Sequence, residues 1–255
     1  MKDFLYSIIL AFSFFTVIPL PIVEWTKKRL KFLPLLMPFV GLLIGILAYG
    51  LYLLLVNASL SNYASSIILA LFFLIITGGV HNDGLMDTAD AYFSRKKIEE
   101  KLVIMKDSRL GVFAVMTFVG MLLFKTALFY EIFCAGKEIA LALLLIPILS
   151  RIFQAYILCC FPCAKKDGLA NTFREAVVPK TPFVLGLYFI VVIILVYNLL
   201  GIKNLLLPIG LVLFTIFYYY FSLKNFGGIT GDVVGAFVEL AEVLLLTILI
   251  IIQLN

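Results

Sequence analysis

Long apolar segments recur along the whole chain and limit what it can fold into. Ordinary soluble domains are about 45–50% apolar, whereas 64% of these 255 residues are hydrophobic, which leaves too few polar side chains for a soluble surface. A membrane-crossing helix needs about 20 mainly apolar residues. Division of the sequence at charges, prolines and glycines predicts eight such segments, at 4–20, 35–56, 64–80, 111–130, 139–160, 183–200, 204–221 and 233–253.

We therefore expect an all-α, polytopic integral membrane protein with about 7–8 transmembrane helices. The first and last segments are the least secure as full spans. No internal repeat divides the chain, so residues 1–255 are interpreted as a single domain. The stretch FLYSIILAFSFFTVI lacks a small-residue cleavage site, and no cleavable signal peptide is expected.

The basic residues alternate between the two sets of connecting loops. Fifteen of the 20 lysines and arginines fall in loops near 27–31, 95–109, 165–180 and 224. The intervening loops carry only Lys137 and Lys203. Because cytoplasmic loops collect lysine and arginine, the first set is predicted to face the cytoplasm. Eight spans would then leave both termini outside.

The four cysteines include a CxxC spacing, Cys160-Phe-Pro-Cys163. Such a spacing can mark a redox or metal site. A zinc site would need further ligands from a second CxxC or a second histidine. The sequence has neither. We expect free thiols at a helix end.

Three aspartates follow the third apolar segment, in the stretch GGVHNDGLMDTAD. Asp83, Asp87 and Asp90 are spaced i, i+4, i+7, which places them on one face of a helix. Like charges beside a membrane repel one another, so either some are protonated or a cation lies among them. Carboxylate oxygens favour a hard cation, Mg²⁺ or Mn²⁺. A solvated first helical turn is the alternative explanation for a single aspartate, but three on one face favour a site.

Other polar residues lie on the same predicted side. His81 and Asn82 stand beside the aspartates, and the histidine is interpreted first as a hydrogen-bonding neighbour. Lys106 and Arg109, in MKDSRLG, suit phosphate oxygens, although interfacial anchoring of the chain explains them equally well.

The sequence before the last segment adds a glycine-rich turn, Gly227-Gly-Ile-Thr-Gly-Asp232. Such a turn before a helix can cradle a phosphate, although one turn alone is a weak signal. Glu239 and Glu242 follow within the last span, and Arg151 lies within the fifth. Ionisable residues inside a membrane are functional candidates. The arginine can either neutralise one of these acids or bind a phosphate.

Several motifs in one order resemble the cobalamin synthase family, the adenosylcobinamide-GDP ribazoletransferases. The residues Thr77–Asp90 resemble its pattern TGGxHxDGLxDTxD, with Asn82 in place of the commoner leucine. The further matching stretches are Phe15–Pro21, Ile104–Gly111, Gly168–Phe173 and Gly227–Asp232 with Glu239 and Glu242. Val233 and Val234 stand where Thr-Leu is usual. The resemblance covers essentially the whole chain.

The resemblance implies a reaction and a set of site residues. A hydroxyl of α-ribazole, or of its 5′-phosphate, attacks the phosphate joined to the aminopropanol of cobinamide, and GMP leaves; Mg²⁺ is the implied cofactor. The expected metal ligands are Asp83, Asp87, Asp90 and Asp232. The expected catalytic residues are Asp83, Asp87, Asp107 and Arg109. The expected substrate-binding residues are His81, Asn82, Lys106, Arg151, Asn171, Thr230 and Gly231.

The expected partners are adenosylcobinamide-GDP, α-ribazole or its 5′-phosphate, and membrane lipid, with no nucleic acid. A homo-oligomer and a complex with other enzymes of the cobalamin pathway both stay open. We expect a multi-pass protein of the cell membrane with its active site facing the cytoplasm.

Three alternatives remain. A membrane prenyltransferase would share an NDxxD-like start, but here the second aspartate comes at i+4 from Asp83 and a second Asp-rich motif is missing. A CDP-alcohol phosphotransferase would carry a longer Asp-rich pattern. An ion-coupled transporter would spread its acids near the bilayer midplane, whereas here the charges gather on one side.

Overall fold

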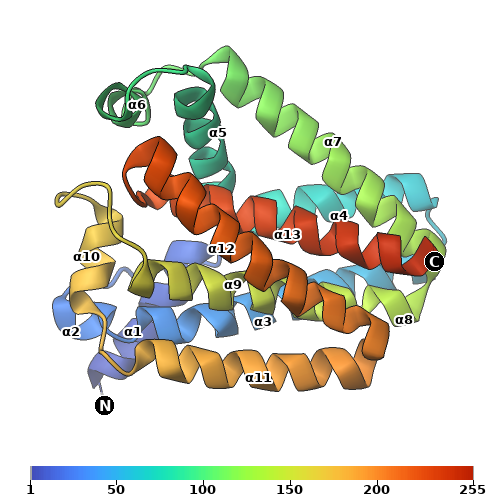
Figure 1. Cartoon of the computed structure of the whole chain (residues 1–255). Helices are drawn as coiled ribbons and strands as arrows, with labels where there is room; N and C mark the ends of the chain where they lie inside the picture. Colours follow the sequence, from blue (N-terminus) through green and yellow to red (C-terminus); the bar gives the residue numbers. More distant parts are fainter. Residues whose placement is uncertain (1, 255) are drawn as a thin grey trace.

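The computed structural model describes residues 2–254 and consists, over those residues, of helices and their connections (Figure 1). One isolated bridge, between Cys163 and Ile229, is the sole β-type pairing among them. The helices are α1 (Lys2–Phe15), α2 (Lys27–Leu30), α3 (Leu33–Asn57), α4 (Asn62–Ile76), α5 (Val80–Phe93), α6 (Ile98–Ile104), α7 (Val112–Ala135), α8 (Lys137–Ala140), α9 (Ala142–Cys160), α10 (Leu169–Ala176), α11 (Thr181–Leu200), a 3₁₀ turn η1 (Ile202–Leu205), α12 (Leu206–Phe226) and α13 (Gly231–Leu254).

Six stretches among residues 2–254 are long and apolar enough to cross a membrane, and the bent pair α4–α5 makes a seventh if it is counted as one span. The all-α, polytopic prediction is confirmed. The eight predicted segments are one too many, because the first one forms only the 14-residue helix α1. This helix ends at Phe15, and the non-helical stretch that follows contains Pro19 and Pro21, each of which disfavours a helical conformation for the residue before it.

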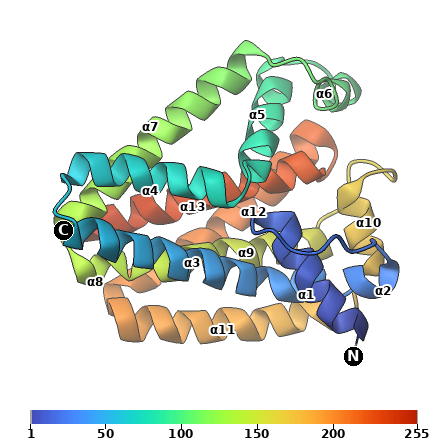
Figure 2. The ribbon, with the colours of Figure 1, turned by 180° about the vertical axis from the view of Figure 1, so that it is seen from behind.

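The short first helix also changes the predicted topology. Asp3 and Ser7 of α1 contact Arg29, by an ion pair of 3.7 Å and a hydrogen bond of 2.8 Å to its carbonyl oxygen. The helix therefore begins at the end of the bundle where α2 and α10 lie, while α13 finishes at the opposite end (Figures 1 and 2). The structure thus places the start of α1 and the end of α13 at opposite ends of the bundle, which differs from the eight-span arrangement with both termini on one side.

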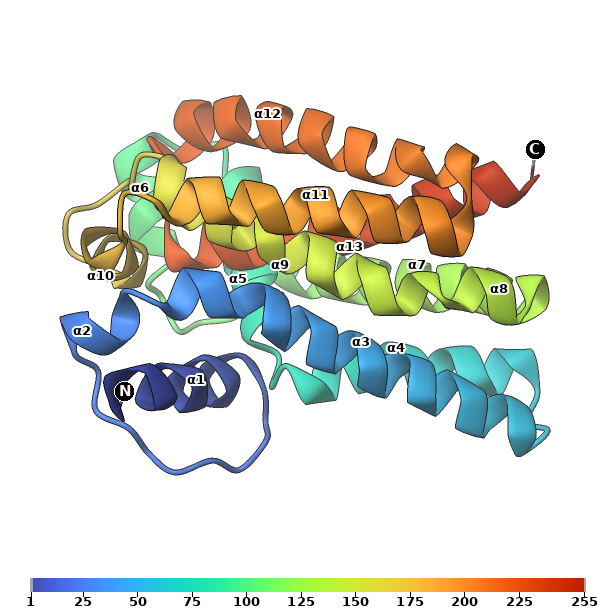
Figure 3. The same ribbon diagram turned by 90° about the horizontal axis from the view of Figure 1, so that it is seen from below.

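Close helix packing forms the centre of the bundle, where α3 runs along α9 (Figure 3). Gly41 and Gly45 of α3 face the main chain of α9. A Cβ at Gly45 would lie 2.6 Å from the carbonyl oxygen of Leu144, and one at Gly41 would overlap that of Pro147. Their GxxxG spacing lets two membrane helices approach backbone to backbone.

The third predicted span breaks before the aspartates. The axes of α4 and α5 differ by 89° across residues 77–79. Gly78 and Gly79 have φ values of 62° and 73°, a left-handed conformation that glycine adopts without a Cβ clash. The apolar part of the pair is α4, and α5, with its aspartates, turns away from the spanning helices at the end of the bundle (Figure 1).

Two loops that are distant in sequence are joined at this same end. The main-chain N–H of Ile229 donates to the carbonyl oxygen of Pro162 at 2.8 Å, and the N–H of Ala164 donates to that of Ile229 at 2.9 Å. The loop after α9 is thereby fixed against the turn that precedes α13. The thiols of all four cysteines are free, as expected.

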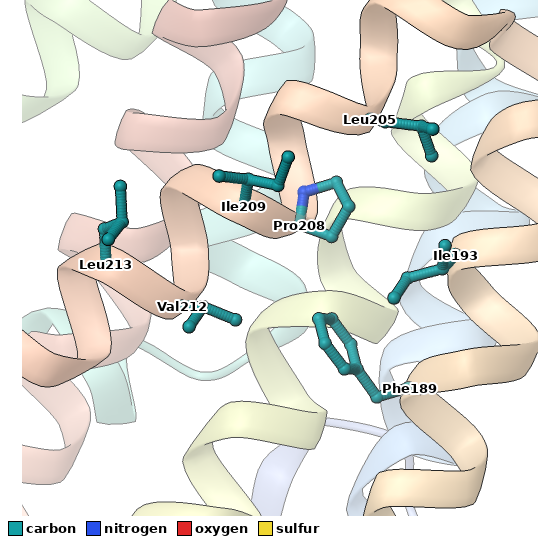
Figure 4. Close-up of a pocket in the computed structure, with 7 residues that line it drawn as sticks. All are labelled: Phe189, Ile193, Leu205, Pro208, Ile209, Val212 and Leu213. Atoms are coloured by element: carbon teal, nitrogen blue, oxygen red, sulfur yellow. The ribbon is translucent and has the colours of Figure 1, made fainter.

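An apolar groove of ≈ 290 Å³ lies between α11 and α12 (Figure 4). Its lining consists of hydrocarbon and aromatic side chains, namely Phe189, Ile193, Leu205, Pro208, Ile209, Val212 and Leu213. It offers no acid, base or hydrogen-bonding side chain, so it lacks the groups of a catalytic site.

Candidate functional site

The candidate site lies where α5 crosses the start of α13. Gly84 of α5 faces the main chain of Asp232, and a Cβ there would lie 2.7 Å from the Asp232 carbonyl oxygen. On α13, Gly235 faces His81 in the same way, with a Cβ position 3.4 Å from the Cα of that residue. Two glycines thus bring the helices together and place the carboxylates of α5 beside Asp232.

Four carboxylates lie near one another at this junction. Burial, together with the charges of Asp83, Asp232 and Asp90, raises the pKa of Asp87 to about 7. The hydroxyl of Thr230 donates to Asp232 at 3.3 Å and accepts from the N–H of Val233, at the first turn of α13. The predicted helical stripe is therefore present, and it is extended by a fourth carboxylate from the C-terminal motif.

A cavity of ≈ 180 Å³, which we call the basic cavity for its two lysines, adjoins this junction, and Asp167 and Asp232 line it as well. Lys106 and Lys165 line it, and the predicted residues Asn171, Thr230 and Gly231 lie on its wall. Burial, together with the charge of Lys106, lowers the pKa of Lys165. Two cations so close to one another, at the edge of a glycine-rich turn, suit the oxygens of a phosphate group.

A second cavity, of ≈ 110 Å³, lies on the other side and is mostly apolar. It is walled by Phe14, Phe15 and Phe173, and its polar lining includes His81, Asp83 and Gln154. The two cavities share Leu169, Ala170, Gly231 and Asp232. Asp232 therefore lines both cavities, and Asp83 lines the aromatic one, whereas Asp87 belongs to the lining of neither.

Comparison with known proteins identifies the family of the chain. The sequence model of the cobalamin-5-phosphate synthase family matches residues 7–250. The chain belongs to this family. No solved structure matches the chain.

Curated relatives cover nearly the whole length. The adenosylcobinamide-GDP ribazoletransferase of Clostridium perfringens (strain SM101) is 34% identical over 95% of this chain and 96% of its own. The enzyme of Clostridium botulinum (strain Langeland) is 35% identical over 98% of this chain and 99% of its own. The enzyme of Geobacillus thermodenitrificans is 36% identical over 93% of this chain and 92% of its own. The resemblance drawn from the motifs is confirmed, and the protein is a membrane transferase of cobalamin biosynthesis. The prenyltransferase, CDP-alcohol phosphotransferase and transporter alternatives are set aside.

Asp90, in the first motif of the synthase family, is hydrogen-bonded to the main chain of the protein. Its two carboxylate oxygens accept hydrogen bonds from the N–H groups of Gly111 and Ala114, each at 2.8 Å. These donors belong to the first turn of α7, where the helix has free N–H groups and a partial positive charge. Asp90 thereby joins α5 to α7, and its place as a metal ligand stays a prediction.

The second family motif holds an ion pair on the surface. Arg109 contacts Asp107 at 2.5 Å, and this hydrogen bonding lowers the pKa of Asp107 to about 2. Neither residue lines the two cavities described above, whereas Lys106 does. The catalytic roles predicted for Asp107 and Arg109 stay predictions.

Arg151 lies inside the bundle in a network of four charges. It contacts Glu242 at 2.9 Å, and Lys125 of α7 contacts Glu242 at 3.2 Å and Glu239 at 2.6 Å. Asn82 of α5 donates to Glu239 at 3.1 Å. Of the two roles considered for Arg151, neutralisation of an acid is the one that the structure displays.

This network lies deeper than the sequence indicated. At 1.5 Å per residue, Glu239 and Glu242 stand about 10 and 15 Å along α13 from Asp232. The charges therefore do not all gather at one end of the bundle. The two acids and the two bases balance each other, which suits a buried structural connection better than a site for a free ion.

The family's fold makes use of residues that the sequence did not single out. Lys125 lay within an apolar segment, and Gln154 was one amide in a hydrophobic helix. Phe14 and Phe15 belong to the first predicted span, and Phe15 also begins a stretch that resembles a family motif. A polar side chain at a buried helix position was the available signal for Lys125 and Gln154 and the family motif was that for Phe15, whereas Phe14 carried none.

The donor atoms at the junction fit a magnesium ion. Asp83, Asp87, Asp232 and Thr230 offer oxygen atoms alone, the ligands that this ion prefers. Within residues 2–254, no three acidic, histidine or cysteine side chains are already gathered round one point as metal ligands. A bound ion would draw the carboxylates together and relieve the repulsion that raises the pKa of Asp87.

Proposed function

We propose that this protein transfers the adenosylcobinamide phosphate moiety from adenosylcobinamide-GDP to α-ribazole or its 5′-phosphate. The products are adenosylcobalamin, or its 5′-phosphate, and GMP. The named activity of the relatives supports this proposal, and so does one feature of the site. Asp232 lines both a cavity with two lysines and a cavity with aromatic walls, an arrangement that suits a reaction between a diphosphate and a nucleoside.

The bond changes follow from the substrates. The oxygen of a ribose hydroxyl forms a bond to the phosphorus atom attached to the aminopropanol of cobinamide. The bond from that phosphorus to the oxygen bridging it to GMP breaks, and GMP departs. The hydroxyl proton passes to a carboxylate of the site, for which Asp83 and Asp87 are the candidates.

The chain's residues divide this work. Lys106 and Lys165 bind phosphate oxygens and oppose the negative charge that grows on the leaving GMP. Asp83, Asp87 and Asp232 would hold Mg²⁺. When bound, the ion would supply a positive charge that stabilises the charge of the transition state.

The charge pattern supports an orientation. The loops that carry most lysines and arginines lie at the site's end of the bundle. We infer that the protein lies in the cell membrane with this end facing the cytoplasm. Large water-soluble substrates would then reach the carboxylates without crossing the bilayer.

The decisive experiment uses the purified protein in detergent with adenosylcobinamide-GDP, α-ribazole and Mg²⁺, and follows GMP release. The wild type is expected to release GMP in a Mg²⁺-dependent manner, and Asp83→Asn to lose at least 10²-fold in rate. Equal rates for wild type and Asp83→Asn would contradict the metal assignment. Turnover of a prenyl diphosphate in place of any corrinoid would contradict the function itself.

A further inference from the structure

The aromatic cavity combines a flat apolar wall with two unpaired polar atoms. Phe15 stacks on His81 with ring centroids 5.9 Å apart, and Phe14 packs edge-on against Phe173 at 5.9 Å. His81 and Gln154 are each 2% exposed. The Nε2 atom of His81 and the Oε1 atom of Gln154 have no hydrogen-bond partner.

Unpaired buried atoms of this kind need a physical reason. Most buried polar side-chain atoms in proteins are hydrogen-bonded, and one left unpaired costs about 1–3 kcal/mol. Here two of them line the same cavity. They come from α5 and α9, and the aromatic walls come from α1 and α10. Four separate elements thus converge on a space whose polar groups await a partner.

The size and lining of the cavity indicate the ligand. Its volume of ≈ 110 Å³ excludes a whole nucleotide. It is also below the about 150 Å³ of a cavity that holds benzene, so a bicyclic base enters it only with part of the ring outside. Apolar side chains such as Val80, Leu158 and Val234 line most of the cavity, and they suit the carbon edge of a base better than an edge rich in donors and acceptors. A benzimidazole joined to ribose has a single free ring nitrogen, and its carbon edge and faces are apolar.

We propose that this cavity binds the benzimidazole base of the acceptor nucleoside. The inference rests on the proposed function and assigns one of its substrates to named residues. His81 Nε2 contacts the ring nitrogen of the base, and Gln154 Oε1 accepts from a ribose hydroxyl. Phe15 and Phe173 pack against the faces of the ring.

The position of the cavity then orders the reaction. Asp83 and Asp232 line it as well, and Asp232 also lines the basic cavity. A base seated among the phenylalanines directs its ribose toward these carboxylates. The phosphates of the second substrate, held by Lys106 and Lys165, approach from the other side. The short helix α1, which does not cross the membrane, supplies a wall of this binding site.

A fluorescence titration tests the assignment without any turnover. Trp25 is the chain's single tryptophan, and it stacks on Phe173 with centroids 5.8 Å apart. The full-length protein in detergent is titrated with α-ribazole, with dimethylbenzimidazole and with guanosine, and free N-acetyltryptophanamide corrects for absorption. The first two are expected to change Trp25 emission in a saturable way, and guanosine is expected to have no effect. Saturable binding of guanosine alone would overturn the assignment.

Steady-state kinetics give the second measurement. Gln154→Leu keeps the side-chain volume and removes a hydrogen-bond acceptor, so the melting temperature should not fall. We expect the KM for α-ribazole to rise about tenfold and the KM for adenosylcobinamide-GDP to change less than twofold. Lys106→Gln is the matched variant in the basic cavity, and the opposite pattern is expected for it. Phe173→Leu provides a further test, with an expected rise in the KM for α-ribazole only.

The outcomes separate the two proposals. GMP release by Gln154→Leu and Phe173→Leu with a wild-type KM for α-ribazole, in a folded protein, would overturn the base site and leave the proposed function standing. Saturable α-ribazole binding that Gln154→Leu weakens, in a protein that releases no GMP, would support the base site and contradict the function. If Gln154→Leu and Phe173→Leu lose neither α-ribazole binding nor turnover, the cavity holds only water and the base site is wrong.

Discussion

Gly84 lies directly against the main chain of Asp232, with room for no side chain between them. This single contact sets how closely α5 approaches α13, and therefore how Asp83 and Asp87 stand relative to the carboxylate of Asp232. The geometry of the site therefore depends on a glycine at this position, because the methyl group of an alanine would separate the two helices.

The first prediction follows from that contact. Gly84→Ala would place a Cβ 2.7 Å from a carbonyl oxygen that belongs to a helix and cannot move freely. We expect α5 to shift and the rate of GMP release to fall by about 10–10²-fold, because small displacements of catalytic groups carry such costs. Gly120→Ala on α7 is the control, since nothing lies within 4 Å of a Cβ there. Equal rates for the two variants would show that the approach of α5 to α13 does not matter.

The second prediction separates Asp90 from the other aspartates. Because its oxygens accept from Gly111 and Ala114, Asp90→Asn would lose one of these bonds and the charge at the start of α7. We expect a loss of about 1–2 kcal/mol in unfolding free energy. The Mg²⁺ concentration for half-maximal GMP release should stay within about twofold of the wild type. Asp87→Asn should show the reverse, with a clear rise in that concentration. A shift as large in Asp90→Asn would restore its assignment as a metal ligand.

The third prediction concerns pH in the absence of divalent cations. In the folded protein the pKa of Asp87 is raised to about 7 by burial and by its acidic neighbours, whereas an unfolded aspartate titrates near its ordinary value of about 3.9. The folded state thus holds its proton at higher pH than the unfolded state, so stability should fall as pH rises from about 4 to 7. Melting temperatures in chelator should decline over this range.

Two comparisons check the cause of that decline. Added Mg²⁺ should reduce it at pH 7 and above, because a cation among the carboxylates offsets their repulsion. Asp87→Asn should flatten the profile in chelator, since the amide does not titrate. A profile that is flat for the wild type, or unchanged in Asp87→Asn, would show that another group governs the pH dependence.

Much of the architecture was predictable because one physical requirement dominates it. A backbone in lipid must satisfy its own hydrogen bonds, so long apolar segments predict the spanning helices. The i, i+4, i+7 spacing predicted that the aspartates of α5 would share a face. The break before α5 was not predicted, because the apolar run continues through Ile76 and Thr77 without a charge. The positive φ values of Gly78 and Gly79 produce it.

Which residues contact one another in the site was harder to predict than which residues belong to it. Asn82 contacts Glu239, 157 positions away, and no local pattern relates the two residues. Phe14 resembles any aromatic residue of a membrane-spanning helix in the sequence, and only the short length of α1 separates it from that class. Hydropathy reports that a side chain is apolar but not which surface it covers, so the aromatic cavity could be found only from the fold.

The last prediction tests the buried charges of Lys125, Glu239, Glu242 and Arg151. Lys125→Met would remove the cation that contacts Glu239 at 2.6 Å and leave that carboxylate buried with only the amide of Asn82. Removal of one partner from a buried ion pair costs about 3–5 kcal/mol. We expect a corresponding fall in the melting temperature measured by circular dichroism in detergent. Lys137→Met, which alters an exposed lysine beyond the end of α7, should cause almost no change. The double variant Lys125→Met/Glu239→Gln removes both charges and should be more stable than Lys125→Met alone. If the double variant is instead the less stable of the two, the lysine does not serve to neutralise Glu239.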